Sequence, residues 1–138
     1  MRIATRGKGG RPLPFAKTYK NPKTARYAAV VTHYAKAAMA LRPLLEGALA
    51  CDILCIFALP AGRHRKREPV AREWRMTKPD WDNLGKPICD AMKGVVYFED
   101  SHIVDGRVRT IWGAQGEEPR AIITLSEPGA VPCQVSPS

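Results

Sequence analysis

Carboxylates are concentrated in one segment of this chain, residues 78–105. Six of the 13 acidic residues fall there, although the whole chain carries a formal net charge of +9. Crowded carboxylates repel one another and raise each other's pKa unless a cation lies among them. An oxygen-rich cluster without a Cys or His pair beside it suits a hard ion such as Mg²⁺ or Mn²⁺. In a basic protein, such a cluster predicts a metal-dependent nuclease that hydrolyses phosphodiesters.

The first acidic pair of this segment is Asp80 and Asp82. Residues two apart on a helix point to different sides, so the pair shares one ion only if Asp80 lies in an extended approach to the helix. Pro79 favours such an entry because proline disfavours the α region for the residue before it. In the plainer alternative, one carboxylate caps the helix and Lys86 pairs with Asp82 on a solvated face. For an isolated pair of this kind, that alternative is the more frequent one.

The neighbours of the pair favour a functional site. Asn83 and Lys86 return to the Asp82 side of the helix, where they add a neutral hydrogen-bonding group and a cation. A second acidic pair, Glu99 and Asp100, follows a turn at Gly94, and this turn allows the pair to fold back against the start of the helix.

Pro87 interrupts the helical pattern. Proline in a regular helix interior costs on the order of 3 kcal/mol. Two arrangements remain open: a helix kinked at Pro87, or a separate turn over residues 82–86 with Pro87 opening the helix at its tolerated first position.

Basic residues lie in three separate regions around the acidic segment: residues 2–26, residues 63–78, and the pair at 107 and 109. The first 45 residues contain ten Lys or Arg and no Asp or Glu. This asymmetry predicts a nucleic acid or, as the weaker candidate, an anionic membrane surface as the partner. Phosphate contacts supply most of the nonspecific affinity for DNA. For the stretch at 63–66 alone, a merely solvated face is the alternative. The predicted DNA-binding residues are Arg63, Arg65, Lys66, Arg67, Arg75, Lys78, Arg107 and Arg109.

The composition argues against membrane insertion and secretion. The longest apolar run, residues 51–60, spans about half of the roughly 20 residues needed to cross a bilayer and contains Asp52. The first residues lack the apolar run of a signal peptide. The four cysteines form no CxxC pair, and Cys51 and Cys55 are expected to be small core residues. We expect a cytoplasmic, reduced protein.

Hydrophobic periodicity predicts one α+β domain over residues 1–127, with a small mixed β-sheet and two main helices packed on it. Apolar residues recur at helical spacing from 27 to 41, and Pro43 is the expected stop. The other expected elements are a short N-terminal strand followed by an irregular basic arm to residue 20, strands at 51–59, 103–112 and 121–125, a helix at 80–93, and a disordered tail at 128–138.

The acidic segment resembles the RusA-type Holliday junction resolvases, small endonucleases often encoded by phages and prophages. The resemblance rests on Lys-Pro-Asp-x-Asp-Asn-Leu-x-Lys at 78–86, an Asp four residues later, a Gly after the helix, and an acidic pair before Ser-x-Ile-Val. It implies that Asp80, Asp82 and Asp100 bind the metal and that Lys86 is also required for catalysis. Asp90 and Glu99 occupy supporting acidic positions.

The same resemblance implies a RusA-like fold and an Mg²⁺-dependent endodeoxyribonuclease, with Mn²⁺ as the alternative ion. Such an enzyme resolves four-way DNA junctions in recombination and repair, leaving 5′-phosphate and 3′-hydroxyl ends. Two cuts related by a two-fold axis imply a C₂ homodimer. Three alternatives stay open: a metal nuclease acting on other branched DNA, a non-catalytic basic DNA-binding module, and a small-molecule phosphohydrolase, against which the long basic arms argue.

Overall fold

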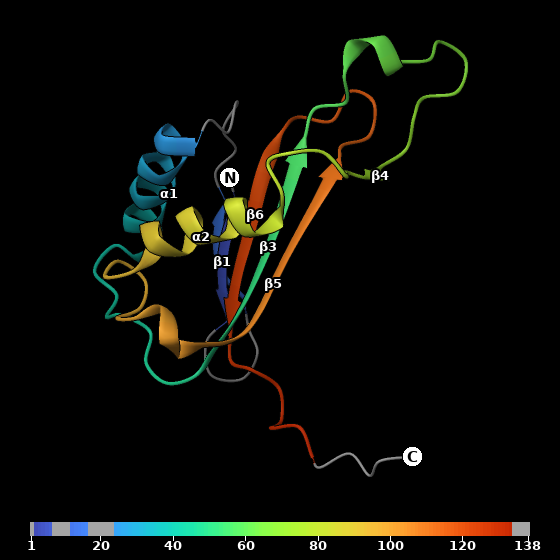
Figure 1. Cartoon of the computed structure of the whole chain (residues 1–138). Coiled ribbons are helices and arrows are strands. Elements are labelled where there is room, and N and C mark those ends of the chain that lie inside the picture. The colour runs from blue at the N-terminus through green and yellow to red at the C-terminus, as the bar shows by residue number, and fades with distance from the viewer. Residues whose placement is uncertain (1, 7–11, 17–23, 134–138) are drawn as a thin grey trace.

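The protein forms a mixed six-stranded sheet with two helices against one of its faces (Figure 1). The computed structural model describes residues 2–6, 12–16 and 24–133. The strands are β1 (Arg2–Arg6), β2 (Pro12–Ala16), β3 (Leu49–Phe57), β4 (Glu73–Trp74), β5 (Ile103–Trp112) and β6 (Arg120–Ser126). The helices are α1 (Thr24–Met39) and α2 (Trp81–Met92), with short 3₁₀ turns η1 (Ala61–Arg63) and η2 (Asp100–His102). The prediction of an α+β fold with a mixed sheet and two main helices is confirmed.

The strand order is β2-β1-β6-β3-β5-β4. The central strand β3 pairs antiparallel with β6 and parallel with β5, and β1 pairs parallel with β6. The strand β2 was not predicted, because an irregular basic arm was expected over this segment, in which Pro12 and Pro14 oppose regular structure. This strand lies at the edge of the sheet, where proline is tolerated because one side of the strand needs no hydrogen-bond donor.

The core lies between the helices and one face of the sheet. Alternate residues of β3 enter it, so the prediction that Cys51 and Cys55 are core residues is confirmed. The other contributions come from Val31, Ala35 and Met39 of α1, Leu84, Ile88 and Met92 of α2, Val96 and Tyr97 after α2, and Ala121, Ile123 and Leu125 of β6. Leu41 was expected on the apolar stripe of the first helix, but that helix ends at Met39 and Leu41 is exposed.

Gly85 allows α2 to pack closely on β5. A Cβ atom at Gly85 would lie 2.8 Å from Cγ2 of Val108, a stiff side chain with little room to move. Val108 therefore faces the helices, and the strand alternation turns Arg107 and Arg109 toward the opposite face of the sheet.

Pro87 lies inside a continuous helix, so a separate turn over residues 82–86 is not formed. Proline has no backbone N–H, and the carbonyl of Asn83 therefore loses its usual donor four residues later. The acidic segment accordingly begins with one helix of 12 residues rather than with two short pieces.

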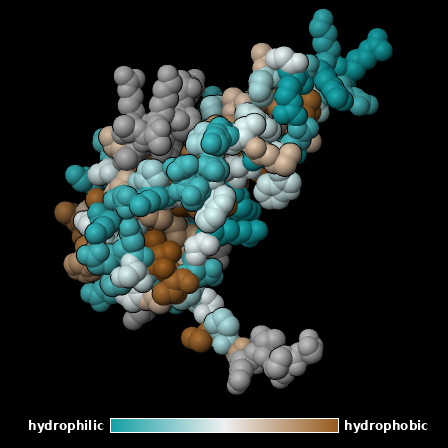
Figure 2. Space-filling view, in the orientation of Figure 1, coloured by the Kyte–Doolittle hydropathy of each residue, from teal (hydrophilic) through white to brown (hydrophobic). Residues whose placement is uncertain are grey.

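Beyond the ends of β3 and β5, the loops at 58–72 and 113–119 form an extension whose tip is strongly hydrophilic (Figures 1 and 2). Gln115 joins the two loops. Its backbone N–H donates to the Val70 carbonyl at 2.8 Å, and its side chain bonds both the N–H and the carbonyl of Arg65 at 2.9 Å. The basic loop is therefore anchored at its base.

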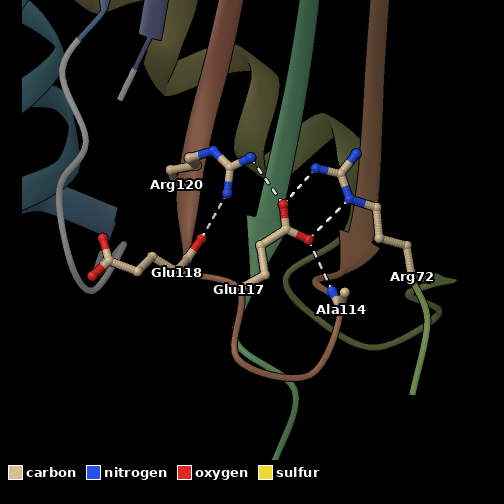
Figure 3. A network of polar contacts seen from close by, with 5 residues as sticks. All are labelled: Arg72, Ala114, Glu117, Glu118 and Arg120. Atoms are coloured by element: carbon tan, nitrogen blue, oxygen red, sulfur yellow. Dashed lines mark hydrogen bonds and ion pairs between the residues drawn. The ribbon is translucent and has the colours of Figure 1, made fainter. Parts of the chain in front are cut away.

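Glu117 forms a second anchor in this extension (Figure 3). Its carboxylate accepts hydrogen bonds from the Arg72 guanidinium and from the Ala114 N–H, and it forms an ion pair with Arg120 at 2.9 Å. Bonding to Arg72 is the main cause that lowers the pKa of Glu117 from 4.5 to about 2. The carboxylate is therefore ionised well below neutral pH.

Parts of two predicted segments fall outside the described residues. Residues 7–11 and 17–20 of the expected basic arm are among them, as are residues 134–138 of the expected tail. Residues 127–133 have no regular secondary structure. None of the helices in the described part of the chain is long and apolar enough to cross a membrane.

Candidate active site

The first acidic pair lies at the start of α2. Asp80 is the N-cap residue with extended backbone geometry (φ −84°, ψ 173°), so the expected extended entry is confirmed. Its carboxylate makes no capping hydrogen bond; Oδ1 instead accepts a bond of 2.6 Å from Nδ2 of Asn83. The backbone N–H of Asn83 donates to Oδ1 of Asp82 at 3.0 Å. Asn83 thus holds both carboxylates at the helix start.

Arg75 supports the turn that leads into this pair. Its guanidinium donates to the carbonyls of Lys78 at 2.6 Å and Pro79 at 2.9 Å and stacks on the Phe57 ring at 3.8 Å. The residue is only 8% exposed, and burial lowers the pKa of its guanidinium. The prediction that Arg75 contacts DNA phosphates is therefore wrong, because the side chain is enclosed and committed to backbone carbonyls.

A groove of about 1010 Å³ runs along the outer face of α2. Asp82, Lys86 and Asp90 line it because residues four apart lie on one side of a helix. Lys78, Pro79, Asn83 and Pro87 complete its lining. The structure thus brings Lys86 to the Asp82 side, as the spacing predicts, and adds Asp90 to the same groove.

Asp100 lies beside the second half of α2, not beside its start. Its Oδ1 accepts a hydrogen bond of 2.9 Å from the hydroxyl of Tyr97, which also lies 2.7 Å from the carbonyl oxygen of Cys89. Cys89 is seven residues after Asp82, or about 10 Å along a helix. Within the described part of the chain, no three Asp, Glu, His or Cys residues are grouped closely enough to hold a metal ion.

Tyr97 is a site residue that the sequence analysis missed. It lies in an apolar run, where an aromatic residue is typical of a core, and it is fully buried. Burial raises the pKa of its phenol, so the hydroxyl remains a hydrogen-bond donor at neutral pH. Nearby, the supporting residue Glu99 forms an exposed ion pair with Lys93 at 3.1 Å, which raises the pKa of that lysine.

The remaining predicted DNA-binding residues fall into two groups. Arg65, Lys66, Arg67, Lys78 and Arg107 are exposed, and their side chains have no acidic partner among the described residues. Arg63 is paired with Glu73, and Arg109 contacts Asp52 at 2.9 Å. Arg107 and Arg109 also lie on the sheet face opposite the groove, so the structure does not bring them to the acidic residues.

Two exposed tryptophans lie on different faces of the protein: Trp74 lies with Arg109 and Ile111 on the sheet face away from the helices, whereas Trp81 is the first residue of α2. Trp74 is 68% exposed and Trp81 is 64% exposed, although large aromatic side chains are usually packed. The sequence allowed Trp74 either to stack on a base or to pack in the core, because the periodic pattern predicts which face of an element is apolar but not whether another element covers it.

One of the comparisons with known proteins identifies a family. The profile of a family described as "Endodeoxyribonuclease RusA" matches residues 2–126. An "Uncharacterized protein YqaN" of Bacillus subtilis (strain 168) is 28% identical over 92 residues, a match that spans 63% of this chain and 63% of that relative. No solved structure matches the chain.

Proposed function

Because the chain belongs to the RusA endodeoxyribonuclease family, we propose that it is a Mg²⁺-dependent, structure-selective enzyme that resolves four-way DNA junctions by paired phosphodiester hydrolysis. Recombination and repair are the processes that generate such junctions. The observation that carries this proposal is the groove on α2, in which Asp82, Lys86 and Asp90 lie together next to Asp80 on a chain of net charge +9.

The side chains at the start of α2 suit magnesium. Their donors are oxygen atoms, and Mg²⁺ in phosphate-processing sites takes one or two carboxylates together with water and substrate phosphate oxygens. Asp80 and Asp82 provide this number of carboxylates, and Asp100 is the third proposed ligand, with Mn²⁺ as an alternative ion. When bound, the ion would lower the pKa of a coordinated water and neutralise charge on the phosphate.

The other residues of the groove would act on the substrate. Lys86 and Lys78 provide positive charge where the phosphate gains negative charge, and a group positioned in advance for this purpose lowers the barrier. Asn83 orients the Asp80 carboxylate through their hydrogen bond. The exposed ring of Trp81, at the start of α2, can stack on an unpaired base at a branch point, which favours branched DNA over a duplex.

The proposed reaction also requires a second active site. Resolution needs two cuts in opposing strands, whereas one chain has one acidic groove. A C₂ homodimer matches the two-fold symmetry of a four-way junction. We therefore propose that the active form is a homodimer.

An end-labelled four-way junction tests this function. The purified protein should introduce paired cuts with Mg²⁺, no cuts in EDTA, and few in linear duplex of the same sequence. Asp82→Asn should abolish cleavage yet leave junction binding unchanged or slightly tighter, because the carboxylate repels DNA. Asp105→Asn, an exposed carboxylate outside the groove, is the matched control.

Two outcomes would contradict the proposal. Cleavage by Asp82→Asn at the wild-type rate would place the metal elsewhere. Binding of the junction without any metal-dependent cleavage by the wild-type protein would instead support a non-catalytic DNA-binding module.

A further inference from the structure

The sheet fixes the position of Arg75. Its backbone N–H donates to the carbonyl of Thr110 in β5 at 3.1 Å, and the Thr110 hydroxyl donates to the Arg75 carbonyl at 2.9 Å. The guanidinium carbon lies 3.8 Å from the centre of the Phe57 ring and 5.2 Å from that of the Trp112 ring. Cation–π contacts strengthen where water is excluded, as it is around this buried side chain. Strands β3 and β5 therefore determine where the guanidinium lies.

The terminal nitrogens of this guanidinium hold the two peptide groups before Asp80. Nη2 donates to the Lys78 carbonyl at 2.6 Å, and Nη1 donates to the Pro79 carbonyl at 2.9 Å. The Pro79 carbonyl belongs to the planar peptide group that contains the Asp80 nitrogen, so fixing this plane restrains the φ angle of Asp80. On the other side, the Asp80 carbonyl accepts a bond of 3.2 Å from the N–H of Leu84. The backbone of Asp80 is therefore held from both directions.

The stability of the fold does not explain an arginine at position 75. Among the described residues, no carboxylate pairs with this buried guanidinium, and its Nε has no hydrogen-bond partner. Burying a charge is costly unless hydrogen bonds and opposite charges compensate for it. An apolar side chain such as Met would occupy the space beside the rings without that cost, and such replacements of buried charges are often neutral or stabilising. Control of the turn before Asp80 does explain the arginine.

The turn matters because it decides what the Asp80 carboxylate does. An Asp at an N-cap usually accepts a hydrogen bond from a backbone N–H in the first turn of its helix. Asp80 makes no such bond, and its Oδ1 instead accepts the bond from Asn83. A released turn would allow the carboxylate to rotate onto the N–H groups of α2 and would withdraw it from a metal ion.

We propose that Arg75 is a positioning residue of the active site, whose paired bonds to the Lys78 and Pro79 carbonyls keep the Asp80 carboxylate available to a metal ion. The inference rests on the proposed nuclease function and adds to it a residue that contacts neither the metal nor DNA. The aromatic rings that enclose Arg75 thus connect the sheet to the first acidic pair.

Binding of Mn²⁺ to the protein without DNA tests this role, because charge and position predict opposite changes. Arg75→Met removes a positive charge near the proposed metal, so charge alone predicts tighter Mn²⁺ binding. Loss of a group that positions a metal ligand predicts binding weaker by about 10- to 100-fold, which is the result we expect in calorimetry. Arg75→Lys keeps the charge but lacks the planar fork that reaches both carbonyls, so we expect it to bind Mn²⁺ no better than Arg75→Met.

The same variants should separate catalysis from DNA binding. We expect the single-turnover cleavage rate on saturating junction to fall with the Mn²⁺ affinity. Junction affinity in EDTA should stay at the wild-type value, because the enclosed guanidinium reaches no phosphate and phosphate contacts supply most of the affinity. A parallel loss of junction affinity would show that Arg75 acts on DNA and would overturn the proposal.

Arg120→Met is the matched control. Arg120 is also a partly buried arginine that donates to a backbone carbonyl, that of Glu118 at 3.1 Å, but it lies at the start of β6 (Figure 3). Its replacement should lower the melting temperature and leave the Mn²⁺ affinity unchanged. An equal loss of Mn²⁺ affinity in both Met variants would assign the effect to general destabilisation and overturn the positioning role.

Other outcomes separate this inference from the nuclease function. Mn²⁺ binding by Arg75→Met at or above the wild-type affinity would overturn the positioning role and leave the nuclease function standing. An Arg75→Met protein that does not fold would do the same, because it would assign the arginine to stability. Wild-type Mn²⁺ affinity in Arg75→Lys would overturn the need for both carbonyl contacts. A wild-type protein that neither binds Mn²⁺ nor cleaves junctions would refute the nuclease function and the inference with it.

Discussion

The Tyr97 hydroxyl has one proton and two acceptors within reach, the carbonyl of Cys89 at 2.7 Å and Oδ1 of Asp100 at 2.9 Å. An ionised carboxylate is the stronger acceptor, so the proton is expected on the Asp100 side when that residue is charged. The bond occupies one carboxylate oxygen and leaves Oδ2 without a hydrogen bond among the described residues. Tyr97 therefore orients a proposed metal ligand without touching the substrate.

Tyr97→Phe removes this bond and keeps the buried ring. Loss of a group that orients a metal ligand typically lowers metal affinity or activity by about 10- to 100-fold. We expect such a decrease in Mn²⁺ affinity, measured by calorimetry, and in the single-turnover cleavage rate. Thr32→Val is the matched control, because it removes another hydroxyl that bonds an α2 carbonyl, that of Ala91 at 3.0 Å. Equal Mn²⁺ affinities in Tyr97→Phe and wild type would contradict the orienting role.

The burial of Arg75 could not be predicted from its neighbours in the sequence. It stands among basic residues, and a run of positive charge favours DNA contact. Its surroundings in the fold are the rings of Phe57 and Trp112, which arrive from β3 and β5, and two carbonyls of the turn before Asp80. Charge is a property of one residue, whereas burial depends on distant strands. The spacing of Asp82, Lys86 and Asp90 was predictable because helix geometry alone sets it.

At the scale of elements, the extension beyond β3 and β5 depends on Glu117. Its pKa of about 2 lies below the usual 4.5 because Arg72, Ala114 and Arg120 all bond the ionised carboxylate. A carboxyl group whose pKa is lower in the folded than in the unfolded protein stabilises the fold. This stabilisation is fully present at pH values above the pKa of the unfolded state. This stability is lost as the pH falls from about 4.5 toward 2.

Glu117→Gln should therefore lower the free energy of unfolding by on the order of 2–3 kcal/mol at pH 7. The difference from the wild type should shrink as the pH falls below 4.5 toward 2, where the wild-type carboxylate also becomes protonated. Urea denaturation at several pH values measures this. Glu118→Gln is the control, because only the backbone carbonyl of Glu118 takes part in the network. A difference that does not vary with pH would assign the effect to packing instead.

The elements with strong hydrophobic periodicity were predictable from the sequence. The segments expected at 51–59, 80–93, 103–112 and 121–125 correspond to β3, α2, β5 and β6 within about two residues at each end. The strand β2 was not predictable, because its prolines oppose regular structure locally, and the continuity of α2 across Pro87 was left open. An edge position in the sheet permits β2, and packing of Gly85 against Val108 holds α2 in place across Pro87.

At the scale of the molecule, the basic residues lie on different parts of the protein surface. The arginines of β5 lie on the sheet face away from α2, whereas the exposed cluster of Arg65, Lys66 and Arg67 lies in the loop of the extension. Sequence alone ranked these groups equally, because it contains no information on which face of the sheet the helices cover. We propose that the extension is the main grip on DNA, since its cations are exposed and Gln115 and Glu117 anchor its base.

If this loop grips phosphates, binding must release counterions, and the logarithm of the association constant falls linearly with the logarithm of the salt concentration. Each neutralised phosphate contributes a slope of about −0.9 on duplex DNA. Replacing Arg65, Lys66 and Arg67 together by Ala should therefore flatten the slope by up to about 3 per chain, measured by fluorescence anisotropy. Preference for a junction over a duplex should persist, because phosphate contacts position the DNA without discriminating.

A Lys36→Ala/Arg42→Ala protein, which loses exposed charges at the end of α1, should keep the wild-type slope. If the loop variant and this control change the slope equally, net charge explains the effect and the loop is only a solvated surface.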